Sequence, residues 1–418
     1  MPKMKNRGNR RPAALLVLVS VVLLFMLVQG CATLRPRSPL PDALESEVEV
    51  PGFPGVRAWG DEISESLMKS ARDSIRQERV AYGEAVFKKP VTFLALSGGG
   101  SDGAFGVGVL YGWTEHGDRP PFNMVTGIST GALIAPFAFL GPQYDVLLRE
   151  CYTTTTTKDI LKIKSLLTVL WREAVADSQP LAKLVAKQVD ARVLAAIAQE
   201  HAKGRRLFIG TTQLDAQRLV IWDMGAIATK GTPEALELFR KILVASASIP
   251  GAFPPQYIKV AAGGRMYQEM HVDGGTTAEV ILYEGALKPF AGLRKVAKKG
   301  VRPRYLYIIR NSQVAGEWAK VKPRITSIGP RAISTLIKFQ GVGDLYRLFV
   351  FAKRDYMDYN LAAIPEDFKA AKKEEFDPVY MTKLFNLGYE MARKGFPWQK
   401  YPPFFEPESI IRTQEQGR

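Results

Sequence analysis

The sequence predicts an α/β fold with a mainly parallel central sheet, and the segment Val91–Leu140 carries that prediction. Its first six residues, Val91–Leu96, form an apolar run without polar alternation, which is typical of a strand buried on both faces of a parallel sheet. A glycine loop, a helical stretch and a second short strand ending near Gly127 follow. The 31 residues from Gly98 to Ser129 match the length of one β-α-β unit, so we expect its two loops to lie side by side.

The two loops of this unit carry residues suited to nucleophilic catalysis. Gly98, Gly99 and Gly100 have no side chain to hold a ligand away, so their N–H groups can converge on an anion. Ser129 is the centre of a G-x-S-x-G pentapeptide between the second strand and the next helix. The small flanking residues permit a sharp turn that lifts the serine hydroxyl to the edge of the sheet. A nucleophile beside an anion cradle is the working hypothesis.

Three interpretations compete for the glycine loop. Its G-x-G-x-x-G pattern between a strand and a helix is typical of a dinucleotide site. Such a site needs an acid near the end of the next strand, yet the first acid after Ser129 is Asp145. A nucleoside-triphosphate loop is excluded because no Gly-Lys-Ser/Thr follows. An oxyanion hole for acyl transfer needs a nucleophile at the end of the next strand, and Ser129 supplies one.

A serine nucleophile also needs a base that accepts its proton. The chain has three histidines, His116, His201 and His271, and none comes late enough for the Ser-Asp-His order of α/β-hydrolases. We expect the first two on the surface and keep His271 as an auxiliary candidate. Asp273 ends a predicted strand and precedes two glycines, a placement typical of a catalytic acid and equally of an ordinary turn. Because the usual pKa of aspartate is about 3.9, a catalytic Asp273 needs burial that raises its pKa.

The first thirty residues have the layout of a secretion signal. Five basic residues precede an apolar run at 13–28, which is short for a membrane-spanning helix. Val28–Cys31 resembles a bacterial lipobox, in which a signal peptidase cleaves before the cysteine and the cysteine is acylated. Gln29 departs from the small or branched residue usual there, and an uncleaved anchor helix is the alternative.

Lipidation of Cys31 implies an exported protein tethered to a membrane by acyl chains. Ala32 after the cysteine resembles an outer-membrane sorting signal, so we expect an outer-membrane lipoprotein that faces the periplasm. Cys151 is the other cysteine of the chain, and with Cys31 acylated no intrachain disulfide is expected.

The net charge of +16 favours anionic surfaces, although five of the positive charges lie in the predicted signal. The densest basic stretch, Lys288–Arg310, contains no acid. It is either a solvated loop and helix end or a contact with phospholipid headgroups. Nucleic acid is not an expected partner, because no groove-reading motif is present.

The whole chain, which is 46% hydrophobic over its 418 residues, is long enough for a large core. Four glycines in the helix after the glycine loop predict close backbone packing against another element. Further strands are predicted at 206–214, 218–223, 267–272 and 304–310, and helices at 233–247, 331–354 and 379–394. The predicted divisions are a signal at 1–30, a lipidated cysteine and tether at 31–56, a helical segment at 57–87, a catalytic domain at 88–313 and a helical extension at 314–418.

Four ordered motifs resemble those of bacterial patatin-like phospholipases, which are lipid acyl hydrolases with a Ser-Asp dyad. They are an oxyanion loop at Ser97–Gly103, a nucleophile elbow at Gly127–Gly131, a Pro-containing loop at Ala247–Pro255 and an Asp-Gly-Gly box at Asp273–Gly275. The resemblance spans Lys88–Asn311 and implies a three-layer α/β/α sandwich. One departure is Ser101-Asp102, where plant patatins carry Arg or Lys after the glycines.

The resemblance implies a membrane-anchored phospholipase A-type enzyme without metal or cofactor, acting on a phospholipid or another acyl ester. Ser129 attacks the ester carbonyl, and Asp273 takes the proton and later activates water. The N–H groups of Gly98, Gly99 and Gly100 hold the oxyanion. The alternative is a non-catalytic lipoprotein that binds lipid or scaffolds envelope partners. Headgroup, acyl-chain preference and oligomeric state are left open by the sequence.

Overall fold

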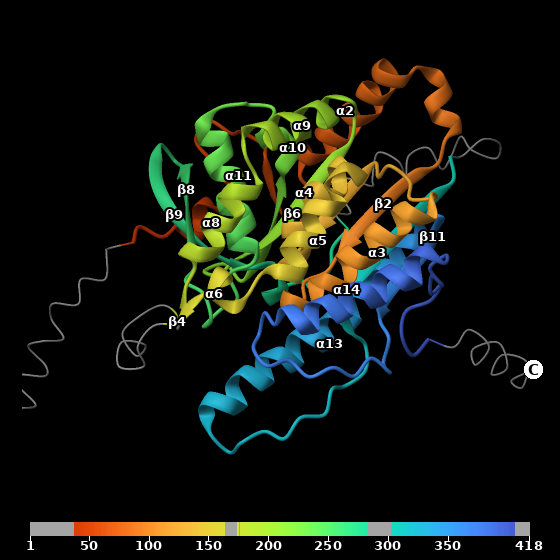
Figure 1. The fold of residues 1–418 in the computed structure, drawn as a ribbon. Helices are drawn as coiled ribbons and strands as arrows, with labels where there is room; N and C mark the ends of the chain where they lie inside the picture. Colours follow the sequence, from red (N-terminus) through yellow and green to blue (C-terminus); the bar gives the residue numbers. More distant parts are fainter. Residues whose placement is uncertain (1–36, 164–173, 175, 283–301, 406–418) are drawn as a thin grey trace, which may run out of the picture. The chain divides into compact units, whose positions relative to one another are not determined.

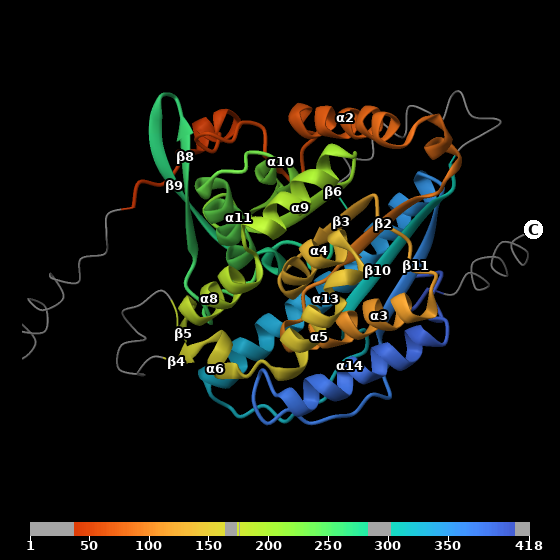
Figure 2. The same ribbon diagram turned by 45° about the horizontal axis from the view of Figure 1, so that its top comes forward.

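The structure is a computed structural model that describes residues 37–163, 174, 176–282 and 302–405. From Leu40 onward these residues form one compact unit, shown in two orientations in Figures 1 and 2. Five neighbouring strands of its sheet run parallel. In order across the sheet they are β6 (Arg206–Gln213), β3 (Met124–Gly127), β2 (Val91–Leu96), β10 (Arg304–Gln313) and β11 (Met357–Ile364). The predicted α/β fold with a mainly parallel sheet is confirmed.

Helices cover both faces of this sheet. Successive side chains of a strand point to opposite faces, and in β2 the pair Leu94 and Leu96 belongs to one hydrophobic core while Phe93 and Ala95 belong to another. The helices of the first core include α3 (Gly103–His116), α4 (Thr130–Leu140) and α14 (Pro378–Arg393), and the second core receives the C-terminal half of α13 (Ile325–Arg354). The expected α/β/α sandwich is therefore present.

The predicted close packing of the glycine-rich helix is found between α3 and α14, which run side by side in both views (Figures 1 and 2). A Cβ added at Gly108 would lie 2.1 Å from the carbonyl oxygen of Phe385, and one added at Gly112 would lie 2.3 Å from that of Tyr389. Gly388 of α14 approaches the backbone of α3 in the same way. Side chains at these positions would push the two helices apart.

The C-terminal part of the chain contributes a strand that the sequence analysis missed, since only helices were expected after residue 313. β11 pairs in parallel with β10 along its whole length, and all but one of its residues are buried. It follows α13 directly, and its apolar–polar alternation extends only over Met357–Leu361 before an unbroken apolar end, which makes a weak strand signal. The sheet of this protein is therefore completed from the C-terminal side of the sequence.

The pairing of β3 and β9 with β6 brings the predicted catalytic loops together. On one side lies β7 (Arg218–Asp223), which pairs antiparallel with β6 and then with β1 (Arg57–Trp59). On the other side Ile209 of β6 pairs with Gly127 of β3, and Thr211 pairs with Asp273 of β9 (Arg265–Asp273), itself paired with β8 (Gln256–Ala262). β3 ends at Gly127, where the predicted elbow begins, and beyond that point β9 pairs with the same edge of β6.

The remaining helices surround this framework. They are α2 (Glu65–Tyr82), α5 (Asp145–Thr154), α6 (Thr157–Ile160), α8 (Gln179–Gln188), α9 (Ala191–Ala202), α10 (Met224–Ala228) and α11 (Pro233–Ser246), with a small two-stranded sheet of β4 (Lys162–Ile163) and β5 (Ala176–Asp177). The strands and helices predicted beyond residue 200 are all found, with ends shifted by a few residues. Within the described ranges, no helix combines the length and apolar character needed to cross a membrane.

Candidate active site

Ser129 occupies a strained turn between β3 and α4. Its φ of 53° and ψ of −124° lie outside the regions that non-glycine residues ordinarily adopt. The two flanking glycines permit the turn: a Cβ at Gly127 would lie 2.5 Å from the carbonyl oxygen of Gly131, and one at Gly131 would lie 2.4 Å from that of Leu96. The turn sets Ser129 directly before the first turn of α4, as predicted for a nucleophile elbow.

A buried serine that the sequence analysis missed holds this turn. The backbone N–H of Ser129 donates to Oγ of Ser246 at 3.0 Å, and the Ser246 hydroxyl donates to the carbonyl oxygen of Gly210 at 2.7 Å. Ser246 is the last residue of α11 and is fully buried. It therefore links the elbow to β6. A serine at the end of an apolar helix was the available signal, but only the fold shows its partner.

Asp273 lies beside Ser129 and is almost fully buried. Its backbone N–H donates to the carbonyl oxygen of Ser248 at 2.9 Å, and its Oδ1 accepts from the N–H of Gly275 at 2.7 Å. Oδ2 accepts no hydrogen bond among the described residues, although the Ser129 hydroxyl is close enough to lower the pKa of the carboxyl. The serine and the aspartate are thus adjacent without a tight hydrogen bond, which is common before substrate binds.

Burial changes the acid–base character of Asp273. It raises the pKa of the carboxyl to about 7, while the Ser129 hydroxyl and the Gly275 N–H act in the opposite direction. A carboxylate with a pKa near neutrality is a far better general base than a solvated aspartate. The requirement stated from the sequence, that burial raise this pKa, is met by the geometry.

The glycine loop supplies two unpaired donors rather than three. The N–H of Gly98 donates to the carbonyl oxygen of Glu279 at 3.1 Å, so this group is occupied, and the expectation that Gly98 helps to hold the oxyanion needs correction. The N–H groups of Gly99 and Gly100 donate to no other described residue, and Gly100 lines the same pocket as Ser129. A φ of 146° at Gly99, where a Cβ would lie 2.0 Å from the Asn311 carbonyl oxygen, explains the need for glycine.

Asn311, near the end of β10, anchors the loop and was not singled out from the sequence. Its side chain accepts from the N–H of Gly106 at 3.1 Å and donates to the carbonyl oxygen of Ser97 at 2.9 Å, while its backbone N–H donates to Oγ of Ser97 at 2.8 Å. Asn311 is fully buried with these bonds satisfied. A polar residue at the carboxyl end of a buried parallel strand was the signal that could have found it.

A second buried carboxyl group, Glu279, lies between the glycine loop and the Asp-Gly-Gly box. A Cβ at Gly98 or at Gly275 would lie 2.7 Å from one of its carboxyl oxygens. Burial, assisted by the Asp273 and Asp344 carboxyls, raises the pKa of Glu279 to about 8, and the Arg310 guanidinium opposes this shift. The site therefore contains two carboxyl groups that resist carrying negative charge together.

Plant patatins carry Arg or Lys after the glycines, where this chain has Ser101-Asp102. Here a lysine from the C-terminal part of the chain, Lys372, lies beside these residues. Nζ of Lys372 lies 2.8 Å from Oδ1 of Asp102 and 3.0 Å from Oγ of Ser101. The hydroxyl of Tyr380 donates to the same Asp102 oxygen at 3.0 Å. The ammonium group of Lys372 thus lies at the glycine loop although it comes 271 positions after Ser101. No local sequence pattern predicts this contact.

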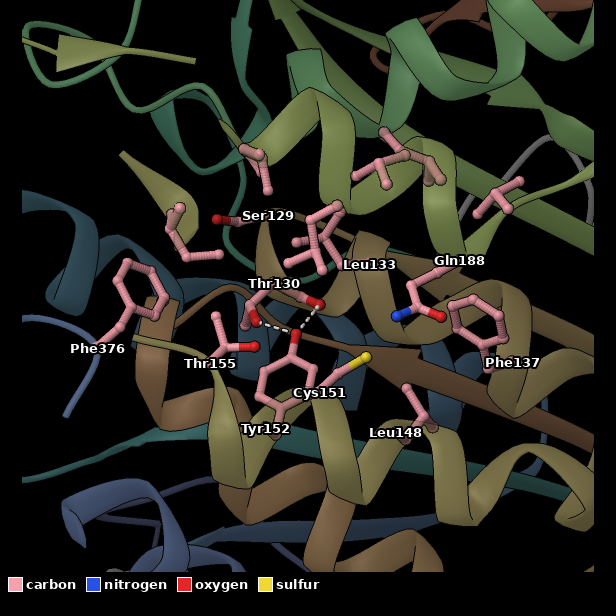
Figure 3. A pocket seen from close by; sticks show the side chains of 18 of the residues that line it. Ser129, Thr130, Leu133, Phe137, Leu148, Cys151, Tyr152, Thr155, Gln188 and Phe376 are labelled. Carbon is pink, nitrogen blue, oxygen red and sulfur yellow. Dashed lines mark hydrogen bonds between the residues drawn. The ribbon is translucent and has the colours of Figure 1, made fainter. Parts of the chain in front are cut away.

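Ser129 lines an apolar pocket whose empty space, including the part open to solvent, is about 870 Å³ (Figure 3). In this view Ser129 and Phe376 lie on the left and Phe137 and Leu148 on the right, and the Tyr152 hydroxyl bonds to Thr130 below the elbow. The lining includes Leu133, Phe137, Leu148, Leu181, Leu184, Val185, Leu243, Ile249, Phe253, Phe376 and Met381. Ile249 and Phe253 belong to the Pro-containing loop, which therefore forms part of the wall.

The histidines do not reach Ser129. Nδ1 of His271 lies 2.9 Å from Oγ1 of Thr211 and Nε2 lies 3.1 Å from Oε2 of Glu269, so both ring nitrogens are engaged in a buried network. His116 is partly exposed and pairs with Asp118. The expectation of a surface position for His201 was wrong, because His201 is buried where α9 meets α10 at Gly225. Within the described part of the chain, no cluster of His, Cys, Asp and Glu could hold a metal ion.

Two predicted features fall wholly or partly outside the described residues. Cys31 lies outside them. Of the basic stretch, residues 288–301 lie outside, while the described members make internal contacts. Arg302 pairs with Glu78 at 2.7 Å, and the guanidinium of Arg310 is buried and donates to the carbonyl oxygen of Lys338 at 2.9 Å.

Comparison with known proteins agrees with this geometry. Residues 94–284 match the family model of the patatin-like phospholipases. This patatin-like region is a little under half of the chain and contains the glycine loop, Ser129 and Asp273. The match supports a lipid acyl hydrolase, the class expected from the four motifs. Asn311, Lys372 and α14 lie beyond the patatin-like region.

The chain is also similar to two solved structures. VipD from Legionella pneumophila has 11% sequence identity and a TM-score of 0.36, covering 73% of this chain and 66% of its own. The type III effector protein ExoU has 11% identity and a TM-score of 0.30, covering 78% of this chain and 58% of its own. The match thus covers about two thirds or less of the length of either protein. No curated protein matches the sequence.

Proposed function

We propose that this protein is a serine lipid acyl hydrolase that cleaves carboxylic esters of lipids, a phospholipase A-type reaction. One observation carries the proposal: a serine in a strained elbow opens into an apolar pocket and has a buried aspartate of raised pKa beside it. The elbow exposes the nucleophile, the aspartate is suited to accept its proton, and the pocket suits an aliphatic chain.

The first half of the reaction acylates the enzyme. Oγ of Ser129 attacks the ester carbonyl carbon as Asp273 accepts the hydroxyl proton. The carbonyl oxygen becomes an oxyanion, which the unpaired N–H groups of Gly99 and Gly100 stabilise. Loss of one such donor typically costs about 3–4 kcal/mol of transition-state stabilisation. The tetrahedral intermediate then expels the alcohol, a lysolipid for a phospholipid substrate, which takes the proton from Asp273.

The second half releases the acyl chain. Asp273 removes a proton from water, the resulting hydroxide attacks the acyl-serine carbonyl, and the fatty acid leaves as Ser129 regains the proton. The same carboxyl thus acts as base in both halves and as acid when each intermediate collapses. Asp273 must therefore be ionised before the attack in each half of the reaction.

The pocket indicates where the acyl chain lies. Leu133 and Phe137 of α4 continue inward from Ser129, and Leu181 and Val185 of α8 face the same space. Because these side chains offer almost no hydrogen-bonding groups, the pocket favours a hydrocarbon chain over a headgroup. The headgroup then stays at the Ser129 end of the pocket, the side on which Figure 3 shows Phe376.

The predicted lipid anchor is part of the proposal. Its support is the lipobox-like sequence Val28–Cys31, which would tether the enzyme to the periplasmic face of the outer membrane. Metabolic labelling with palmitate tests it. Label is expected in the wild type and not in Cys31→Ala, and label retained by Cys31→Ala would contradict acylation at this residue.

The decisive experiment is labelling with a fluorophosphonate ester probe combined with product analysis. We expect the wild type to be labelled and to release fatty acid, Ser129→Ala to do neither, and Asp273→Asn to lose hydrolysis while it stays folded. Thr153→Ala, on the exposed side of α5, is a matched control that should behave as the wild type. Folded wild type that binds lipid but is neither labelled nor active would instead favour a non-catalytic lipid-binding lipoprotein.

A further inference from the structure

The N-terminal half of α13 and the segment before it present large apolar side chains to solvent. Trp318 is 89% exposed, Ile325 81% and Leu336 71%. The other exposed apolar side chains of this surface are Val321, Ile328, Ile333 and Phe339. Isolated exposed apolar residues are common on proteins, but seven large ones between Trp318 and Phe339 indicate an interaction surface.

The two halves of α13 differ sharply in their surroundings. Leu345, Leu348 and Ala352 of the second half are buried in the core beneath the sheet. In the first half, Ile325, Ile328, Ala332, Leu336 and Phe339 follow a three- and four-residue spacing, so they form one stripe along the helix. Figure 1 shows this half projecting away from the body of the protein. Among the described residues, no element covers the stripe.

Basic residues surround the stripe. Between Ala315 and Gly343 the chain has five Lys or Arg and a single acid, Glu317. Glu317 is paired with Lys338, so its charge is already neutralised. Three further cations, Lys320, Lys322 and Arg324, are exposed and have no acidic partner among the described residues. Exposed apolar side chains bordered by unpaired cations are the composition of elements that lie at an anionic membrane surface.

This surface starts next to the catalytic loop. It follows β10 directly, within a few residues of Asn311, which holds the glycine loop. Burial raises the pKa of the Asp102 carboxyl, and the negative charge of Glu317 adds to this rise, so the start of the surface lies near Asp102 and its partner Lys372. Just beyond the other end of this surface, a Cβ added at Gly341 would lie 3.0 Å from Cγ of Glu279, so this part of α13 is also close to the site. A membrane bound here would lie close to the site.

We propose that Trp318–Phe339 is a docking surface with which the protein binds an anionic lipid bilayer, its apolar stripe entering the interface while the neighbouring cations contact lipid phosphates. The surface is distinct from the proposed N-terminal lipid, which fixes the chain to a membrane without orienting the domain. Docking is independent of the proposed Ser129 chemistry and is tested in its absence.

The first test reports the environment of single positions in the full chain. An environment-sensitive fluorophore is placed on Leu336→Cys in a Ser129→Ala, Cys151→Ala background, with Val80→Cys, another exposed apolar position, as the matched control. Vesicles of phosphatidylcholine with phosphatidylglycerol should shift the emission to the blue and expose position 336, but not position 80, to quenching by brominated lipid. Because the readout is local, attachment through the N-terminus does not imitate it.

Three outcomes would overturn the proposal. They are equal responses at positions 336 and 80, an equal response to vesicles of phosphatidylcholine alone, and a shift that depends on protein concentration without vesicles. The last would assign the surface to a second copy of the chain.

The second test separates docking from catalysis. Ile325→Glu/Leu336→Glu should lower the hydrolysis of vesicle lipid by about tenfold or more, since charged side chains are excluded from the interface, while hydrolysis of a soluble short-chain ester stays unchanged. Val80→Glu is the control. Neutralising the three cations, Lys320→Gln/Lys322→Gln/Arg324→Gln, should remove most of the salt dependence on anionic vesicles. Loss of activity on the soluble ester as well would point to a damaged site and contradict a docking role.

Discussion

The backbone N–H of Ser129 is bonded to the hydroxyl of Ser246, which in turn donates to the Gly210 carbonyl oxygen. These two bonds fix the proposed nucleophile to the central strand β6. The backbone of Ser129 is strained, and such strain typically costs about 1–3 kcal/mol. The strained backbone conformation persists because the hydrogen bonds through Ser246 hold the turn in it.

Replacing Ser246 with alanine should loosen the elbow. The substitution leaves the buried N–H of Ser129 unpaired, so we expect a loss of about 1–3 kcal/mol in the free energy of unfolding and a kcat lowered by about tenfold or more through misplacement of the hydroxyl. Ser248→Ala is the matched control, because this neighbouring buried hydroxyl donates to the Val244 carbonyl oxygen and not to the elbow. Equal kcat values for the two variants would contradict a positioning role for Ser246.

The glycine loop should tolerate alanine at one position and reject it at the next. Gly99→Ala places a Cβ 2.0 Å from the Asn311 carbonyl oxygen, so we expect loss of ester hydrolysis and a lower melting temperature. At Gly100 the φ of 57° is one that alanine adopts at a cost of about 1–2 kcal/mol, and the nearest contact is 3.4 Å. Gly100→Ala should therefore keep measurable activity. The reverse order would place the oxyanion contact elsewhere.

Activity should depend on pH through two carboxyl groups. The rate constant kcat/KM is expected to rise as Asp273 ionises near pH 7, because only the ionised form accepts the serine proton. It should fall as Glu279 ionises near pH 8, because a second negative charge then lies beside the forming oxyanion. Glu279→Gln should keep the acid limb of the profile and lose the alkaline one. An unchanged alkaline limb in that variant would exclude Glu279 as its cause.

The same burial that activates Asp273 should destabilise the fold. Because the pKa of its carboxyl rises from 3.8 to about 7 on folding, the folded state holds the proton more tightly, so its contribution to stability is lost as the pH rises from about 4 to about 7. Asp273→Asn cannot ionise, so its free energy of unfolding should increasingly exceed that of the wild type over this range, with the difference constant above it. Chemical denaturation at a series of pH values measures the difference.

Asp190→Asn is a control of opposite sign for that titration. Backbone hydrogen bonds, first that from Val193, lower the pKa of Asp190, so the variant should lose stability relative to the wild type as the pH rises through the carboxylate range. A stability difference for Asp273→Asn that is independent of pH would show that the carboxyl of Asp273 titrates normally.

Filling the pocket should change chain-length preference rather than chemistry. Val185 is buried in the pocket wall. Val185→Trp should lower the hydrolysis of long-chain esters by about tenfold or more. Acetate esters need only the space beside Ser129 and should be cleaved as before. Val146→Trp, at an exposed position on α5, controls for the added indole. Equal losses on long and short esters would mean that the acyl chain binds elsewhere.

The adjacent positions of Ser129 and Asp273 could be predicted from sequence because each residue lies in a local pattern with a physical reason. Small residues around Ser129 permit the elbow, and Asp273 stands at a strand end before two glycines. The occupied N–H of Gly98 could not be predicted, since its acceptor, Glu279, comes 181 residues later. Ser246, Asn311 and Lys372 were missed for the same reason: each acts through a partner that only the folded sheet brings near.

The position of β10 between β2 and β11 bears on how the protein can be shortened. A fragment that ends with the patatin-like region at residue 284 would lack β10, and β2, an apolar strand buried on both faces, would become an open sheet edge. Such an edge is a template for aggregation. It would also lack Asn311 and the α14 backbone against which α3 packs. For this protein, the segment recognised by homology is smaller than the smallest piece that can be expected to fold and stay soluble.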